Sequence, residues 1–181
     1  MVFCFINRNI MKPNILYLHG FQGFVTDEKK EFLDSIGNSF YPFLDYENEA
    51  DSIINRLLKI IKEKNIDLIA GTSLGGMITY YLGLITEKPT MLLNPAVIAV
   101  PQLSEFIPEE IRSKKATKDI LVFSGKKDEV VPFELQKEFF ENLEKDSTID
   151  IEFNEEENLV HLVELDYFKK FFKKFLKKNN Y

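Results

Sequence analysis

The sequence predicts one α/β domain, in which a mostly parallel sheet of about six strands is covered by helices on both faces. Two observations support this fold class. Short apolar runs alternate along the chain with longer segments whose apolar residues recur at helical spacing. The chain has 181 residues, 45% of them hydrophobic, and no internal repeat or linker divides it. This is enough apolar material for one well-packed core.

In the first part of the chain, two expected strands are each followed by an expected helix. Residues 15–18 form a short apolar run that ends at a His-Gly pair, and residues 26–37 follow with apolar side chains at helical spacing. Residues 40–44 are the second strand. Residues 50–64 carry isoleucines and leucines three and four positions apart, which predicts an amphipathic helix.

The middle of the chain contains a glycine-rich turn between a strand and a helix. Residues 67–70 are the expected strand and residues 71–76 the turn, from which a helix runs to about residue 86. Residues 90–93 are the fourth strand. Residues 94–116 contain three prolines, so we expect a loop with one short helix at residues 105–112.

The last third repeats the alternation. Residues 120–124 and 148–153 are expected strands, and residues 132–144 form a helix with proline in its first turn. The final helix, residues 162–178, carries phenylalanines at helical spacing with lysines between them. We expect its apolar face to pack on the sheet. The alternative is a basic amphipathic helix that contacts an anionic membrane surface.

The N-terminus is treated separately from the domain. Residues 1–10 are expected to be an extension that need not be ordered, and residues 11–181 the folded domain. Met11 is an alternative start. The apolar stretch at the beginning is a poor signal peptide, because Arg8 follows it and no small-residue cleavage site appears.

Composition and charge exclude several classes of function. The formal net charge is −6, so the chain lacks a basic footprint and no nucleic-acid partner is expected. Cys4 is the only cysteine, which excludes an intrachain disulfide and a cysteine metal cluster and favours a reducing cytoplasm. No apolar run approaches the ~18 residues of a membrane span. Neither a metal nor a cofactor is expected.

Ser73 is the candidate nucleophile. It lies in Gly71-Thr72-Ser73-Leu74-Gly75, between an expected strand and an expected helix, which is the context of a nucleophile elbow. A serine on such a strained turn needs glycines two positions away on each side, because larger side chains would collide. The Leu74 N–H, at the helix start, can then donate to an oxyanion. The alternative, a phosphate-binding turn, lacks the third glycine and a lysine.

A serine hydroxyl needs a base, and the chain has two histidines. His161 lies between the last strand and the last helix, after Ser73, which is the position that the order nucleophile, acid, base requires. His19 precedes the elbow at the end of the first strand. We therefore interpret His161 as the general base and His19 as a structural residue.

Asp128 is the candidate acid that orients the base. It follows the strand at residues 120–124, in the loop that ends at Pro132, and its neighbour Glu129 is the competitor. The loop after the preceding strand begins with Asn94, which cannot stabilise an imidazolium with a charge. This difference favours Asp128.

These segments resemble the α/β-hydrolase superfamily and, within it, the small bacterial YqiA-type esterases. The resemblance rests on residues 16–21, 71–76, 93–97 and 125–132, and covers most of the chain from Met11 onward. It implies a compact esterase without a large cap, acting through an acyl-enzyme, with the backbone amides of Phe21 and Leu74 as oxyanion donors. The sequence departs from the family before His161, where an acidic run replaces the usual glycine.

The expected activity is hydrolysis of a small carboxylic ester or thioester. Two alternatives stay open: a binding protein of the same fold in which the three residues are unproductive, and an amidase or peptidase that uses the same residues. The acidic run, Glu155 to Glu157, suggests a further hypothesis, that negative charge collects at the mouth of the site and disfavours anionic substrates. A solvated loop without influence is the alternative.

Overall fold

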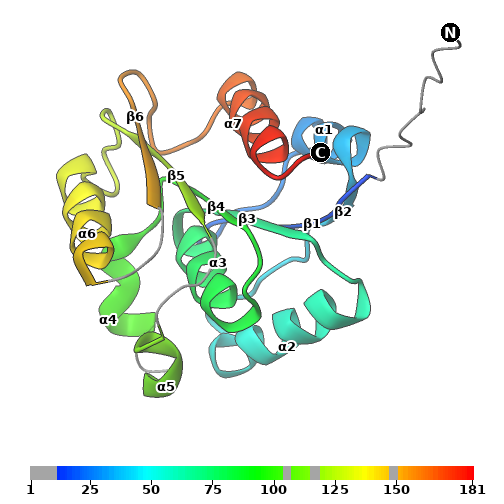
Figure 1. The fold of residues 1–181 in the computed structure, drawn as a ribbon, viewed down its shortest axis with the longest axis horizontal. Helices are drawn as coiled ribbons and strands as arrows, with labels where there is room; N and C mark the ends of the chain where they lie inside the picture. Colours follow the sequence, from blue (N-terminus) through cyan, green and yellow to red (C-terminus); the bar gives the residue numbers. More distant parts are fainter. Residues whose placement is uncertain (1–11, 104–106, 115–118, 147–150) are drawn as a thin grey trace, which may run out of the picture.

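The computed structural model of the chain describes residues 12–103, 107–114, 119–146 and 151–181, which form one parallel sheet between two layers of helices (Figure 1). The order of strands across the sheet is β2-β1-β3-β4-β5-β6, and every neighbouring pair is parallel. This confirms the predicted fold class. The strands are β1 Asn14–Leu18, β2 Asn38–Phe40, β3 Leu68–Thr72, β4 Thr90–Leu93, β5 Ile120–Gly125 and β6 Ile151–Glu156.

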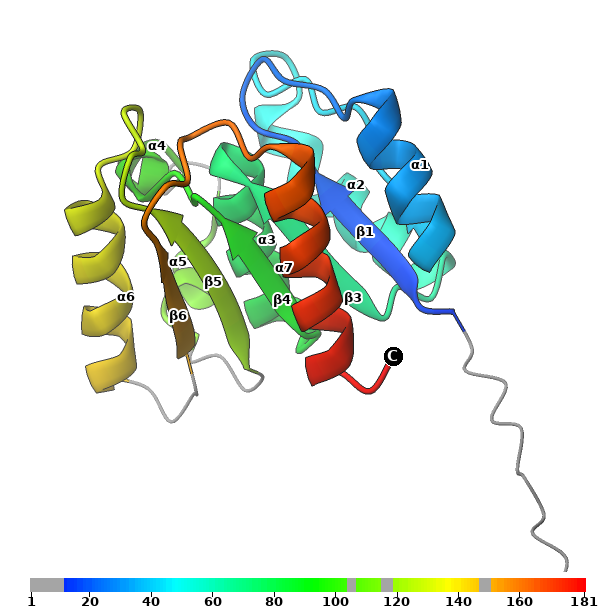
Figure 2. The same ribbon diagram turned by 90° about the horizontal axis from the view of Figure 1, so that it is seen from above.

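Helices cover both faces of the sheet. One face is covered by α1 and α7, on the near side of the sheet in Figure 2, and the other by α2, α3 and α6. Side chains of β1 alternate between the two cores, as a pleated strand requires: Ile15 and Tyr17 pack with α1 and α7, and Leu16 and Leu18 with α2 and α3. The helices are α1 Asp27–Ile36, α2 Ala50–Glu63, α3 Ser73–Thr86, α4 Val100–Leu103, α5 Glu109–Arg112, α6 Phe133–Asp146 and α7 Leu165–Lys178, with a 3₁₀ turn at Val97–Ala99.

The two edge strands lie elsewhere than predicted. The second strand, expected at residues 40–44, is Asn38–Phe40, since Pro42 has no N–H to donate and the amide of Leu44 donates to His19 Nε2 at 3.0 Å. The last strand, expected at residues 148–153, is Ile151–Glu156, and residues 148–150 lie outside the described part of the chain. It extends through the acidic residues because their carboxylates bind lysines on the flanking helices.

The segment between β4 and β5 is more helical than predicted. The expected helix at residues 105–112 is seen as α5, Glu109–Arg112, and residues 104–106 are not described. The 3₁₀ turn and α4 were missed because prolines suggested a loop. Pro101 occupies the second position of α4, where a helix does not need its N–H.

The C-terminal helix packs on the sheet, as its phenylalanine pattern predicts. Phe168, Phe171, Phe172 and Phe175 are at most 1% exposed. These four phenylalanines are therefore not available to enter a lipid surface, so the alternative of a membrane-surface helix is not supported. Among the described residues, no helix is both long and apolar enough to cross a membrane. The predicted extension, residues 1–10, lies outside the described residues.

Candidate active site

Ser73 occupies a strained turn between β3 and α3. β3 ends at Thr72 and α3 begins at Ser73, whose φ is 53°. A left-handed conformation costs a non-glycine residue about 1–2 kcal/mol. The neighbours enforce it: a Cβ on Gly75 would collide with the His19 carbonyl oxygen, and one on Gly71 with the Gly75 carbonyl oxygen. This close packing is the physical reason for the glycine spacing in the sequence.

The structure brings Ser73, His161 and Asp128 into one hydrogen-bonded line. They follow the ends of β3, β6 and β5, at the upper edge of the sheet in Figure 2. His161 Nε2 lies 3.0 Å from Ser73 Oγ, and His161 Nδ1 lies 3.0 and 2.9 Å from the carboxylate oxygens of Asp128. With the ring proton on Nδ1 bound by the carboxylate, Nε2 can accept the hydroxyl proton of Ser73.

Asp128 is held rigidly as a buried carboxylate. Its side chain is 0% exposed. The N–H groups of Val130 and Val131 donate to Oδ1 at 2.9 and 2.8 Å, and Gln136 Nε2 donates to Oδ2 at 3.3 Å. These donors offset the cost of burying the charge. The competitor, Glu129, is exposed. Asp128, which the sequence favours, is the carboxylate that contacts the imidazole of His161. Gln136 was missed, since a single glutamine in a helix gives no sequence signal.

Asn94 connects the segments after β5 and β6 that carry Asp128 and His161. It is fully buried after β4, with a φ of 42°. Its Oδ1 accepts the N–H of Gly125 at 2.8 Å, and its Nδ2 donates to the carbonyl oxygens of Val160 at 2.8 Å and His161 at 3.2 Å. From the sequence, Asn94 was considered only as a position where the orienting acid could have been but is not. The structure shows that its amide, which both donates and accepts, fixes the histidine loop to β5.

His19 is a structural residue, as predicted. It is 3% exposed. Its Nδ1 donates to the Gly20 carbonyl oxygen at 2.8 Å, and its Nε2 accepts the N–H of Leu44 at 3.0 Å. A neutral imidazole satisfies both contacts. Because both ring nitrogens are occupied, His19 has no free nitrogen to act as a base.

The two predicted oxyanion donors lie beside the elbow. Leu74 is in the first turn of α3, where backbone N–H groups have no acceptor within the helix. Phe21 follows β1 and lines a pocket of about 160 Å³ together with Ser73 and His161. This reaction pocket also contains Lys29, whose ammonium lies 5.1 Å from the ring centroid of Phe168. Burial lowers the pKa of Lys29 below its ordinary value.

The acidic run does not supply a free negative field. Glu155 binds Lys126 and Lys137, and hydrogen bonds from these lysines lower its pKa. Glu157 also binds Lys126, at 2.6 Å. The hypothesis that these carboxylates govern the charge of the site is therefore not supported. In the part of the chain that the structure describes, no group of three or more histidine, cysteine or acidic side chains is arranged to hold a metal.

A parallel sheet with a serine on a strained strand-to-helix turn, and with an aspartate and a histidine after later strands, defines the α/β-hydrolase class. The resemblance expected from the sequence, to small YqiA-type members of this class, is confirmed. The chain belongs to the family described as Uncharacterised protein family (UPF0227), which matches residues 14–114, more than half of its length.

Solved structures of the same fold include several esterases. SOBER1 of Arabidopsis thaliana has a TM-score of 0.65 and 18% identity, covering 93% of this chain and 99% of that one. Acyl-protein thioesterase 2 of Zea mays has a TM-score of 0.65 and 15% identity, with 95% of each chain covered. Esterase Pf2001 of Pyrococcus furiosus has a TM-score of 0.65 and 14% identity over 94% of this chain and 84% of that one. At these identities the likeness shows the fold. A search of curated proteins found no significant match.

Proposed function

We propose that the chain is a serine esterase that cleaves carboxylic esters or thioesters through an acyl-enzyme on Ser73. The observation that carries this proposal is the hydrogen-bonded line from Asp128 through His161 to Ser73, with contacts of 2.9 and 3.0 Å. A nucleophile within hydrogen-bond distance of a base that a third group orients is the arrangement that nucleophilic catalysis requires.

In the proposed reaction, His161 Nε2 takes the hydroxyl proton while Ser73 Oγ attacks the carbonyl carbon. Asp128 keeps the imidazole in the required tautomer and stabilises its charged form. The backbone N–H groups of Leu74 and Phe21 would donate to the oxyanion. Each such donor typically raises kcat by about 10²–10³-fold. The alcohol or thiol then leaves with the proton from His161. Water, activated by the same imidazole, releases the acid and restores Ser73.

The solved structures support ester or thioester cleavage over amide cleavage. Their names describe an acyl-protein thioesterase and esterases. The position of His161, 2.9 Å from Asp128 and 3.0 Å from Ser73, also argues against a binding protein in which a displaced histidine loop leaves the three residues unproductive. Amide cleavage uses the same groups, so matched substrates have to separate the two reactions.

Labelling with a fluorophosphonate probe tests the proposal. Wild-type protein should be labelled on Ser73 and should hydrolyse p-nitrophenyl esters. Ser73→Ala should lose the label and lower kcat by about 10⁶. Ser113→Ala, at an exposed serine on the C-terminal side of α5, is the matched control and should keep both.

Three outcomes would contradict the proposal. A labelled Ser73→Ala protein would show that another residue is the nucleophile. No labelling and no hydrolysis between about pH 6 and 9 would favour a binding protein. Faster cleavage of a p-nitroanilide than of the p-nitrophenyl ester with the same acyl group would show an amidase.

A further inference from the structure

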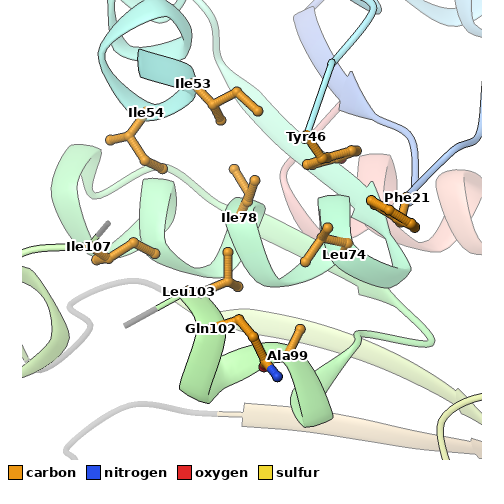
Figure 3. A pocket seen from close by; sticks show the side chains of 10 residues that line it. All are labelled: Phe21, Tyr46, Ile53, Ile54, Leu74, Ile78, Ala99, Gln102, Leu103 and Ile107. Carbon is orange, nitrogen blue, oxygen red and sulfur yellow. The ribbon is translucent and has the colours of Figure 1, made fainter. Parts of the chain in front are cut away.

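A second cavity, of about 220 Å³, begins next to the elbow: Phe21 and Leu74 line it, whereas His161 lines only the reaction pocket. Figure 3 shows Phe21 and Leu74 at one end and Ile54 and Ile107 at the other. Leu74 and Ile78 line it from the same side of α3, one turn apart, so this wall extends about 6 Å along the helix away from the elbow. Helices α2 and α4 form the other walls. The cavity therefore leads from the proposed nucleophile into the helix layer.

The walls of this cavity are almost entirely apolar. Of the described residues that line it, only Tyr46 and Gln102 carry polar side chains, and none is ionised. The Tyr46 hydroxyl donates to the carbonyl oxygen of His19, and burial raises its pKa. Gln102 is exposed at the rim. A charged group inside would lose its hydration without gaining a partner.

The position of His161 assigns the two halves of an ester to the two cavities. The imidazole must protonate the leaving alcohol or thiol, so the leaving group has to lie in the reaction pocket that His161 lines. The acyl chain then extends to the other side of Ser73, past Leu74, into the apolar cavity. Phe21 lines both cavities.

We propose that the apolar cavity is the acyl-chain subsite and that it selects a neutral aliphatic acyl group of about eight carbons. This inference rests on the proposed esterase function. The size follows from the volume: about 30 Å³ for each water-sized group gives about seven methylene or methyl groups in 220 Å³, beyond the carbonyl carbon held at Ser73. The neutrality follows from the lining itself, in which no described residue carries an ionised side chain.

A series of p-nitrophenyl esters with graded acyl chains tests the size of the subsite. Each methylene that leaves water should raise kcat/KM by about fourfold, until the cavity is full near the octanoyl ester. Longer chains should gain nothing more. The monoester of octanedioic acid, with a carboxylate at the far end, should be at least about tenfold poorer than the octanoyl ester.

Two pairs of variants test where the acyl chain of the substrate binds. Ala99→Phe should fill the cavity, lowering kcat/KM for the octanoyl ester by about tenfold or more while leaving the acetyl ester unchanged. Its control is Ile98→Phe, at the neighbouring residue, which is 48% exposed and does not line this cavity. Ile54→Ala should enlarge the far end and move the optimum to longer chains. Its control is Ile60→Ala, half-buried on the same helix and outside the cavity.

Direct binding separates failure of the subsite from failure of the esterase. Calorimetry with octanoate and Ser73→Ala protein measures occupancy of the cavity without catalysis. Binding that Ala99→Phe abolishes and Ile98→Phe keeps would support the subsite even if no ester were hydrolysed. Hydrolysis with a flat chain-length profile, or octanoate binding that Ala99→Phe does not change, would overturn the subsite and leave the esterase intact.

Discussion

Replacing Asn94 by alanine tests whether this side chain holds the loop that carries His161. The buried N–H of Gly125 would lose its acceptor, 2.8 Å away, at a cost of about 1–3 kcal/mol. Alanine also adopts the left-handed φ of 42° less readily than asparagine, which adds about 1 kcal/mol. The free energy of unfolding should therefore fall by about 2–4 kcal/mol. For a chain of this size, Tm should fall by about 10 °C.

The same substitution should lower the rate in the folded protein. Asn94 Nδ2 holds the carbonyl oxygens of Val160 and His161 at 2.8 and 3.2 Å. Without these contacts, His161 Nε2 is no longer fixed 3.0 Å from Ser73 Oγ. A displacement of about 1 Å at a reacting group costs about 10²-fold in kcat.

Thermal unfolding and hydrolysis of p-nitrophenyl butyrate, measured well below Tm, check both effects. Asn94→Gly is the matched control, because it removes the same hydrogen bonds but accepts the left-handed backbone. It should be about 1 kcal/mol more stable than Asn94→Ala and equally slow. Wild-type kcat in folded Asn94→Ala would refute the inference that Asn94 positions His161. If kcat were low in Asn94→Ala but normal in Asn94→Gly, the loss of rate would come from the strained backbone and not from the missing hydrogen bonds.

Further substitutions separate the roles of neighbouring residues. Asp128→Asn should lower kcat by about 10⁴, while Glu129→Gln should have little effect; the reverse ranking, measured with one ester, would move the acid by one residue. Gly75→Ala should yield an unstable or insoluble protein in expression and melting experiments, because its Cβ would collide with the His19 carbonyl oxygen. Glu152→Gln should flatten the loss of stability in acid, measured by urea unfolding across pH. Lysine hydrogen bonds lower the folded-state pKa of Glu152, so its contribution is full above the unfolded pKa of about 4.3 and is lost as pH falls through the folded pKa. Unchanged acid sensitivity would show that the two ion pairs of Glu152, with Lys174 and Lys178, contribute nothing.

Features that depend on local sterics and chain order could be predicted from the sequence. The glycine at position 71 indicates the elbow because the collision that excludes a larger side chain there, with the Gly75 carbonyl oxygen, occurs within five residues, whereas Gly75 is required by the distant His19 carbonyl oxygen. The order nucleophile, acid, base along the chain then selects His161 as the base and places the acid in the loop after residues 120–124. The central strands were also predicted, since they are buried on both faces and appear as continuous apolar runs.

Features that depend on distant partners could not be predicted. The edge strands β2 and β6 pair on one side only, so their ends are set by Pro42 and by lysines on the helices rather than by an apolar pattern. Asn94 and His161 are 67 residues apart in sequence, and their contact has no local signal. The same holds for Gln136 and Asp128, whose contact requires α6 to pack against the end of β5.

The ion pairs along β6 also determine how this edge of the sheet meets other molecules. An edge strand exposes unpaired N–H and C=O groups, to which a strand of another chain can add. Here Glu152, Asn154 and Glu156 bind lysines of α7 on one face, and Glu155 binds Lys137 of α6 on the other. A strand of another chain that paired with β6 would have to remove water from these charged side chains on both faces of the sheet. At the opposite edge, β2 offers only three residues. Copies of this chain are therefore protected at both edges against association through their sheets.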